Sequence, residues 1–407
     1  METSTTGTTL LTINEAHAAH HHSTSAQNGS SEVSLTSSEC QLVFASTESN
    51  TIHLTFVLIG GLICLAGLIA NGFLLSALVR LQLENNANQL LYYSWLCVLD
   101  MLVAVCYVLI HGVYTFIEFI HESQPELAVL LIRWWWFYYI YAFVISRASL
   151  VAAAFVMIFA SVERLFLTFK LAALHCWQRR RWLLCLTGVL IGVTLNGSMM
   201  LEFRLDAKNC SGLNEFQVST NDEFLEGHKV YAVVWKFYGR NTFAVLLPFF
   251  SLIFINYAVV YKLKRQSILI VHVSARRRAV RTATNTLLTI VATYVISNTL
   301  HVALTLWEFI DLESLYAMPS LYYSLSDVIS LLTITAGATR LAVHLAFNDQ
   351  IRRCLETHLR WCRTRRRHRK PTNGALTSYD ELNANGEPRP SGPVLMSTNL
   401  MRMVGHV

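Results

Sequence analysis

Charged side chains are scarce in this chain, and this scarcity sets the first limit on what the protein is. Only 14% of its 407 residues are Asp, Glu, Lys or Arg, and 53% are hydrophobic. A soluble domain carries about 25% charged residues. The shortage of charge argues against an ordinary water-soluble protein and predicts an integral membrane protein.

The motifs of several enzyme classes are missing. The sequence contains no Gly-x-Ser-x-Gly nucleophile elbow, no phosphate-binding Walker loop and no His-Glu-x-x-His zinc motif. Runs of Arg and Lys at 179–181, 276–278 and 363–370 each border an apolar run, so they indicate juxtamembrane anchors rather than a nucleic-acid surface. We therefore expect no catalytic residues, no cofactor, no metal centre and no nucleic-acid partner.

Lys and Arg are also absent from residues 1–52, which are rich in Ser and Thr. This segment lacks the periodicity of a core-forming element and is predicted to be a disordered extracellular tail. No basic residue precedes an apolar stretch there, so we expect no cleavable signal peptide and insertion by the first spanning helix. Asn28 begins a glycosylation sequon, and the His-rich tract near His20 would hold a metal only weakly.

Long apolar runs follow the tail, each with about the 20 residues that a bilayer requires. The seven runs lie near residues 54–80, 89–115, 134–166, 182–203, 230–262, 282–310 and 317–347. They predict an all-α membrane protein, a seven-transmembrane-helix bundle over residues 53–347. No repeat relates the two halves, which counts against many transporter folds.

Most of the 32 Lys and Arg residues fall in segments that are inside the cell if the N-terminus is outside. The positive-inside rule therefore predicts an extracellular N-terminus and a cytoplasmic C-terminus. The three tryptophans Trp134 to Trp136 are predicted to lie in an interfacial aromatic belt.

The segment after the seventh run places apolar residues on one helical face and arginines largely on the other. Residues 348–362 are therefore predicted to form a short amphipathic eighth helix on the membrane surface. Cys354 and Cys362 are candidate palmitoylation sites, and buried or free thiols are an equal alternative. Residues 363–407 are predicted to be a disordered cytoplasmic tail.

Polar residues within the apolar runs are the candidates for function. Asn71 lies in the first run, Asp100 in the second, and the pair Glu163–Arg164 ends the third. A carboxylate in the membrane is costly, so Asp100 should face inward and have a partner. Taken alone, Asn71 or Asp100 could simply join neighbouring helices.

Taken together, Asn71, the Leu-x-x-x-Asp motif ending at Asp100 and the Ser-Val-Glu-Arg motif ending at Arg164 resemble the rhodopsin-like (class A) G-protein-coupled receptors. The resemblance covers about residues 54–362. Further matching positions are the fifth-helix proline, Pro248, and the start of the eighth helix, Asn348 and Arg352. The resemblance implies that Arg164 meets a heterotrimeric G protein on activation, that Glu163 is its resting partner, and that arrestin is a further candidate partner.

The departures from the family pattern are informative. Residues 340–344 stand in place of the seventh-helix Asn-Pro-x-x-Tyr signature, and residues 297–300 in place of the sixth-helix Cys-Trp-x-Pro signature. In these departures the chain resembles a divergent invertebrate branch of the family, the nematode-type neuropeptide and chemosensory receptors. Val280 and Arg281 stand where an acid would hold Arg164 across helices, so we expect appreciable ligand-free activity.

The family's sodium site is also altered. The counterpart of Asp100 helps to hold sodium with a third-helix Ser and a seventh-helix Asn, whereas Ala153 and Arg340 occupy those positions here. A guanidinium would pair with the carboxylate directly. We predict an Asp100–Arg340 salt bridge in place of the sodium site, in a polar network with Asn71 and His344.

Of the nine cysteines, only Cys40 and Cys210 are expected outside the cell. The family's bridge to the third helix cannot form, because Tyr139 occupies its place. A Cys40–Cys210 disulfide is the candidate, with free or intermolecular thiols as alternatives. Asn209 begins a sequon that overlaps Cys210.

The candidate ligand pocket consists of Ser146, Arg147, Lys236 and Arg240. Ser146 stands where amine receptors carry Asp, and the seventh run has no Lys for retinal, so an amine receptor and an opsin are disfavoured. Buried Arg can bind a carboxylate through two hydrogen bonds. The alternative is that these cations pair with acids of the chain, namely Glu118, Glu308, Asp311 or Asp327.

These observations favour a glycosylated plasma-membrane receptor that binds an extracellular peptide or small molecule, contacts membrane lipid and signals through G proteins. A neuropeptide is the favoured ligand. One alternative is a chemosensory receptor for a small acidic molecule. The alternatives from another functional class are a channel or transporter and an intramembrane enzyme.

Overall fold

The computed structural model describes residues 47–85, 90–207, 216–267, 275–354 and 356. All of them belong to one compact unit, Met1–His358. Several predictions lie outside the described residues: the tail up to residue 46, the segment 357–407, the glycosylation sites Asn28 and Asn209, the candidate disulfide of Cys40 with Cys210, and Cys362.

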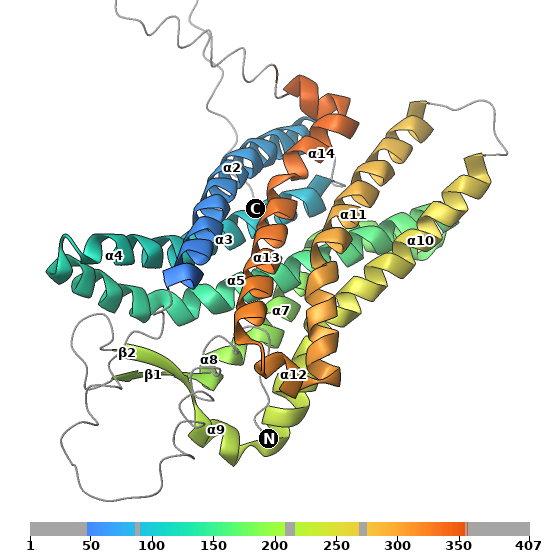
Figure 1. Ribbon diagram of the computed structural model, residues 1–407. Helices are drawn as coiled ribbons and strands as arrows, with labels where there is room; N and C mark the ends of the chain where they lie inside the picture. Colours follow the sequence, from blue (N-terminus) through green and yellow to red (C-terminus); the bar gives the residue numbers. More distant parts are fainter. Residues whose placement is uncertain (1–46, 86–89, 208–215, 268–274, 355, 357–407) are drawn as a thin grey trace, which may run out of the picture. The chain divides into compact units, whose positions relative to one another are not determined.

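The described residues are almost entirely helical (Figure 1). The elements are α2 (Thr47–Asn85), α3 (Leu91–Tyr107), η2 (Val108–Gly112), α4 (Val113–His121), α5 (Pro125–Phe169), α6 (Ala173–Arg179), α7 (Arg181–Gly197), α8 (Met199–Glu202), β1 (Phe203–Ala207), β2 (Phe216–Thr220), α9 (Asp222–Gly227), η4 (Tyr231–Gly239), η5 (Thr242–Leu246), α10 (Leu247–Ser267), α11 (Ala275–Ile310), α12 (Leu312–Tyr316), α13 (Pro319–Ala338) and α14 (Arg340–Phe347).

In the part of the chain that the structure describes, seven helical stretches are long and apolar enough to cross a bilayer. They are Leu54–Glu84, Leu91–His121, Pro125–Phe169, Arg181–Glu202, Tyr231–Arg265, Thr282–Ile310 and Ser320–Phe347. The predicted all-α, seven-helix fold is confirmed, and the protein is a multi-pass membrane protein.

Some helices begin earlier than the apolar runs of the sequence. The first starts at Thr47, inside the segment 1–52 that was assigned to the tail. The third spanning helix, α5, starts at Pro125 rather than near Trp134, because a proline at the first helical position has the required φ and needs no N–H partner there.

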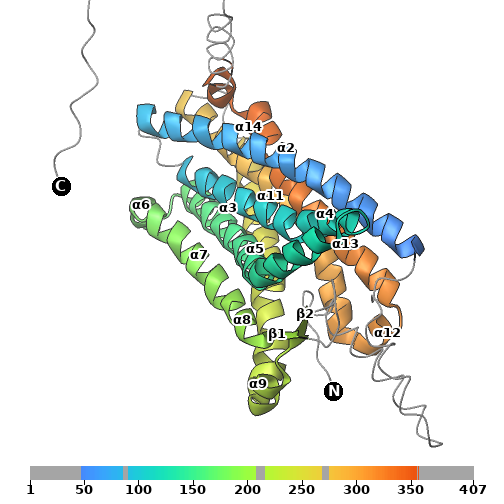
Figure 2. The same ribbon diagram turned by 90° about the vertical axis from the view of Figure 1, so that its left-hand side faces the viewer.

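The bundle is organised around α5, which packs against α3 and α7 (Figure 2). It also packs against α10. Gly192 of α7 explains the close approach to α5, since a side chain there would overlap the Ala148 carbonyl. Fully buried apolar residues from four helices fill the core, namely Leu74, Leu78, Leu96, Met157 and Leu287.

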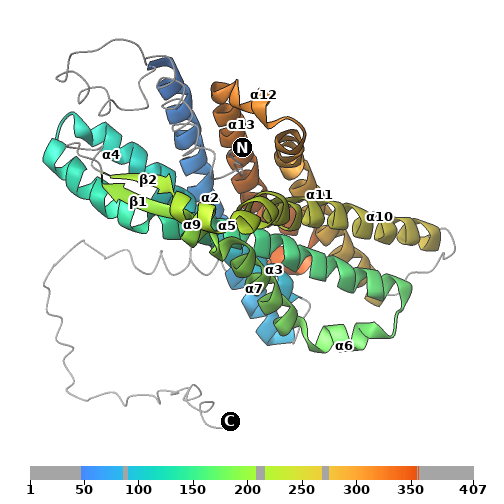
Figure 3. The same cartoon turned by 90° about the horizontal axis from the view of Figure 1, so that it is seen from below.

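A β-hairpin joins the fourth and fifth spans, and the sequence reasoning did not predict it. Its strands, β1 and β2, pair antiparallel from Phe203 opposite Thr220 to Ala207 opposite Phe216. The hairpin lies beside the first half of α5 (Figures 1 and 3), where Phe203 and Val218 are buried against α5. We call this end of the bundle the hairpin end, and the other end the Arg164 end.

The fifth span contains two π-helical stretches, η4 and η5, before α10 begins. Pro248 is the second residue of α10. Proline has no N–H and its ring collides with the carbonyl of the preceding turn, so the helix before it cannot keep regular α-helical bonding. The wider turns η4 and η5 flank Arg240 and Asn241.

The last span, Ser320–Phe347, is interrupted once and ends before Asn348. Thr339 separates α13 from α14, and Asn348 has an extended backbone after α14. Residues 349–354 are helical again, with Ile351 fully buried in the core and Cys354 packed against it. Residues 355 and 357–362 of the predicted eighth helix lie outside the described residues, so that helix remains a prediction.

Candidate functional site

Asp100 and Arg340 form an ion pair inside the bundle. Arg340 Nη1 lies 2.8 Å from Asp100 Oδ2, and the two side chains are 9% and 11% exposed. The predicted salt bridge is therefore confirmed. Neither of these atoms has a well-aligned hydrogen bond within the described part of the chain. The carboxylate and the guanidinium therefore attract each other as two charges at short range, and not through a directed hydrogen bond.

The surroundings of this pair are built by four helices, α2, α3, α13 and α14. Asn71 of α2 donates through Nδ2 to the Gly337 carbonyl at 3.2 Å. Gly337 lets α13 approach α3, because a Cβ there would lie 3.2 Å from the Asp100 carboxyl carbon. His344 lies one turn after Arg340 and is buried against Tyr93, with ring centroids 4.8 Å apart. The structure thus brings the predicted polar residues together.

Glu163 binds Arg181 rather than Arg164. Arg181, the first residue of α7, donates through Nε at 2.8 Å and through Nη2 at 2.5 Å to the two carboxylate oxygens. The prediction that Glu163 is the resting partner of Arg164 is wrong. The planar guanidinium at the start of α7 faces the carboxylate across the α5–α7 interface, which is the favourable two-bond geometry.

Arg164 is buried and interacts instead with the Tyr93 hydroxyl. The same hydroxyl donates to the Ala283 carbonyl of α11 at 3.3 Å. Tyr93, with its ring against His344, therefore connects α3, α5, α11 and α14 at the Arg164 end. Sequence reasoning missed Tyr93; the available signal was its position two turns before Asp100 on the same helical face.

A cavity of about 240 Å³ runs inside the bundle. Its lining extends from Tyr139 and His301 to the Asp100–Arg340 pair. Of the predicted pocket residues, Ser146, Arg147 and Arg240 line it. Lys236 is buried but is not among the described residues that line it, so its assignment to this pocket is wrong.

Arg240 is held by an acid that the sequence did not single out. Its Nη1 and Nη2 atoms lie 2.7 and 3.0 Å from the two oxygens of Glu202, and both side chains are buried. The Tyr231 hydroxyl donates to the same carboxylate at 2.6 Å. Glu202 ends α8, so its place opposite the fifth span depends on how the fourth span ends and could not be read from spacing.

The hairpin is fixed to α5 by apolar packing. Val218 and Phe203 pack against Tyr139, Phe143 and Val144. Tyr139 is itself stacked on Phe143. In the described residues, aromatic contacts thus connect the hairpin to α5, the third span.

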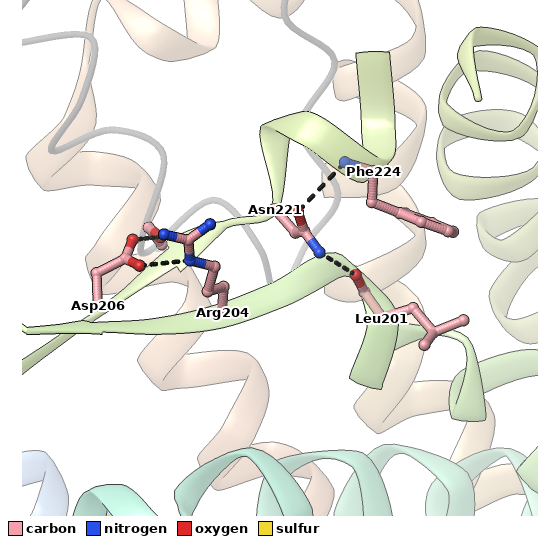
Figure 4. A network of polar contacts seen from close by, with 6 residues as sticks. Leu201, Arg204, Asp206, Asn221 and Phe224 are labelled. Carbon is pink, nitrogen blue, oxygen red and sulfur yellow. Dashed lines mark hydrogen bonds and ion pairs between the residues drawn. The ribbon is translucent and has the colours of Figure 1, made fainter. Parts of the chain in front are cut away.

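A polar network stabilises the hairpin and the turn that follows it (Figure 4). Arg204 Nε lies 2.6 Å from Asp206 Oδ1, and the Ser219 hydroxyl donates to the same carboxylate. The hydrogen bond from Ser219, with the contribution of Arg204, lowers the pKa of Asp206. Asn221 accepts from the Phe224 N–H at 3.2 Å and so caps α9.

The aromatic-belt prediction is wrong for Trp135. This residue is buried, and its indole N–H donates to the carbonyls of Leu109 and Ile110, at 3.2 and 3.0 Å. Those carbonyls lie in η2, where the wider turn alters the regular bonding. Trp134 is 63% exposed, as a belt residue would be.

Comparison with known proteins adds no relative. No protein-family model matches the chain, and a search of curated proteins finds no match. Among the described residues, no group of three or more His, Cys, Asp and Glu is placed to hold a metal ion. The functional argument therefore depends on the geometry of the bundle.

Proposed function

We propose that the protein is a rhodopsin-like G-protein-coupled receptor of the plasma membrane. In this proposal the hairpin end is extracellular, the Arg164 end is cytoplasmic, and the ligand enters the cavity. The observation that carries the proposal is the cavity itself, which reaches from Arg147 to the Asp100–Arg340 pair. A ligand in it can thus act on α3 and α14, the helices that carry Tyr93 and His344.

The charge distribution supports this orientation. Basic residues gather at the Arg164 end, on the segment between α5 and α7 and at the end of α10, namely Lys170, Arg179, Arg180, Lys264 and Arg265. Such residues are typical of cytoplasmic segments.

A peptide is the favoured ligand because the cavity is small. Pockets for whole drug-sized ligands measure about 300–1,000 Å³, so a cavity of about 240 Å³ suits one or two terminal residues of a peptide. The rest of the peptide would lie over the hairpin. Binding shifts the population towards conformations in which Arg164 leaves Tyr93 and meets a G protein.

The test is nucleotide exchange on a panel of Gα subunits, with membranes that contain the full chain. We expect exchange above that of empty membranes, and its loss in Arg164→Ala at equal surface expression. Arg180→Ala is the matched control, because this exposed arginine lies in the turn before α7. Equal exchange by wild type, Arg164→Ala and empty membranes would remove the proposal.

A receptor for a small acid is the second candidate, because Arg147 and Arg240 both line the cavity. Ligand libraries of peptides and of small acids separate the two. Ligand-gated current in membranes without G protein would favour a channel.

A further inference from the structure

Arg240 and Asn241 occupy an unusual place in the fifth span. They lie between the π-helical stretches η4 and η5, and both line the cavity. Turns of this kind occur frequently at functional sites, because they reorient side chains relative to a regular helix. Here the local geometry places a cation and an amide donor next to each other at one wall of the cavity.

Asn241 has an unused donor. Its side chain is 4% exposed, and its Nδ2 atom has no hydrogen-bond partner among the described residues. A buried amide donor without a partner is costly and rare in native proteins. The other cavity asparagines differ, since Nδ2 of Asn298 donates to the Tyr294 carbonyl at 2.9 Å and Nδ2 of Asn196 to the Gly192 carbonyl at 3.1 Å.

Arg147 of α5 brings a second cation to the same cavity. It lies over the Phe143 ring, 5.6 Å from the centroid, and close enough to Arg240 for the two charges to repel each other. Arg240 is fixed by Glu202 and cannot turn away without breaking two hydrogen bonds. An anion between the two guanidinium groups would relieve this repulsion.

Among the described residues, the acids near these two cations have contacts of their own. Glu202 is bound to Arg240 from outside the cavity lining. Glu308 interacts with Arg147, but one of its oxygens accepts from the Tyr322 hydroxyl at 3.2 Å. Asp327 lines the cavity and interacts with Tyr107 of α3.

We infer that Arg147, Arg240 and Asn241 form a subsite for a carboxylate of the ligand. This inference rests on the proposed ligand-binding function. The guanidinium groups provide charge and paired N–H donors, and the Asn241 amide provides a further N–H. The carboxylate comes from the free C-terminus or an acidic side chain of a peptide, or from a small organic acid.

The experiment is thermal unfolding of the purified full chain in detergent, which needs no G protein. The probes are acetate, succinate, glutamate and citrate, together with short peptides as free acids and as C-terminal amides. We expect at least one carboxylate probe to raise the Tm in a saturable manner. A free-acid peptide that acts where its amide does not identifies a peptide C-terminus, whereas a small acid that acts alone identifies an organic acid.

Variants then locate the site. Asn241→Leu and Arg147→Gln should each weaken binding of the active probe at least tenfold. The matched control is Asn256→Leu, because Asn256 of α10 is not among the described residues that line the cavity and its amide already donates to the Leu252 carbonyl at 2.8 Å; this variant leaves binding unchanged. If Arg147→Gln does not fold, Asn241→Leu alone tests the inference. The inference is overturned if no carboxylate raises the Tm, if chloride or phosphate acts equally, or if Asn241→Leu binds as wild type does.

The outcome also separates this inference from the receptor proposal. Nucleotide exchange driven by an uncharged, amidated peptide would keep the receptor function and overturn the carboxylate subsite. Saturable, Asn241-dependent binding of an acid without any exchange would support the subsite and remove the receptor function.

Discussion

Asp100 and Arg340 show at the level of single residues how a bundle can retain charges in a membrane. Each is the counter-charge of the other, and both are nearly excluded from solvent. Removing one partner of a buried pair leaves an uncompensated charge, which costs about 3–5 kcal/mol. Replacing both by neutral groups avoids that cost.

We therefore expect Asp100→Asn and Arg340→Gln each to lower the Tm of the purified protein clearly. The double variant should be more stable than either single variant, because no unpaired charge remains. Thermal unfolding in detergent measures all four proteins. Simple addition of the two single effects would show that the pair is not coupled. The Tm of the wild type should not depend on sodium, because Arg340 already supplies the counter-charge of Asp100.

Tyr93 is the second residue whose role follows from its contacts. Its hydroxyl interacts with Arg164 and with the Ala283 carbonyl, and thus restrains α11. The acid that would hold Arg164 across helices is absent from the start of this helix, where the sequence has Val280 and Arg281. Under the receptor proposal, Tyr93→Phe should raise ligand-free nucleotide exchange several-fold, because the ring contact with His344 stays and only the hydroxyl is lost. A neighbouring tyrosine provides the control.

That control is Tyr92→Phe, because the buried Tyr92 hydroxyl interacts with Glu163, which Arg181 already holds through two hydrogen bonds, and not with Arg164. It should leave basal exchange at the wild-type level. Equal exchange by wild type and both variants, at equal expression, would exclude a restraining role for the Tyr93 hydroxyl. Basal exchange of wild type at the level of empty membranes would contradict the expected ligand-free activity.

At the level of elements, the hairpin is the part that depends most on its surroundings. Two five-residue strands are too short to be stable alone, and they are held by packing on α5 and by the Asp206 network. The lowered pKa of Asp206 means that its carboxylate is stabilised as an anion in the folded state. This contribution is present above the unfolded-state pKa and is lost as the pH falls through the lower, folded-state pKa.

We expect the backbone amides of β1 and β2 to lose protection against hydrogen exchange as the pH falls below about 4, the ordinary Asp range. Asp206→Asn should remove this pH dependence while the helices remain protected. Hydrogen exchange with mass spectrometry, corrected for the intrinsic rate at each pH, measures it. The same pH dependence in Asp206→Asn would assign the effect to another group.

At the level of the whole molecule, the orientation in the membrane determines what each end of the bundle meets. Cys176 of α6 is exposed at the Arg164 end. In the proposed orientation, a membrane-impermeant maleimide should label it only after cells are permeabilised. The comparison of wild type with Cys176→Ser identifies its signal. Cys176-dependent labelling of intact cells would reverse the orientation and place Arg164 outside.

The sequence by itself determined the number of spans and their approximate bounds, because a bilayer requires about 20 apolar residues from each helix. It also determined that Asp100 needs a partner, since a lone carboxylate in the membrane is costly. Together with the family resemblance, this was sufficient to predict Arg340 as the partner.

Only the tertiary structure decided which charge meets which elsewhere. How each helix is rotated about its axis and where it ends determine the pairs Glu163–Arg181 and Glu202–Arg240 and the position of Tyr93. The spacing of residues within one helix gives no information on that rotation or on that end. The hairpin, too, depends on how the helices pack and could not be predicted from spacing. The strands bury Phe203 and Val218 only because α5 presents Tyr139 and Phe143 to them, and that surface exists only once the bundle has formed.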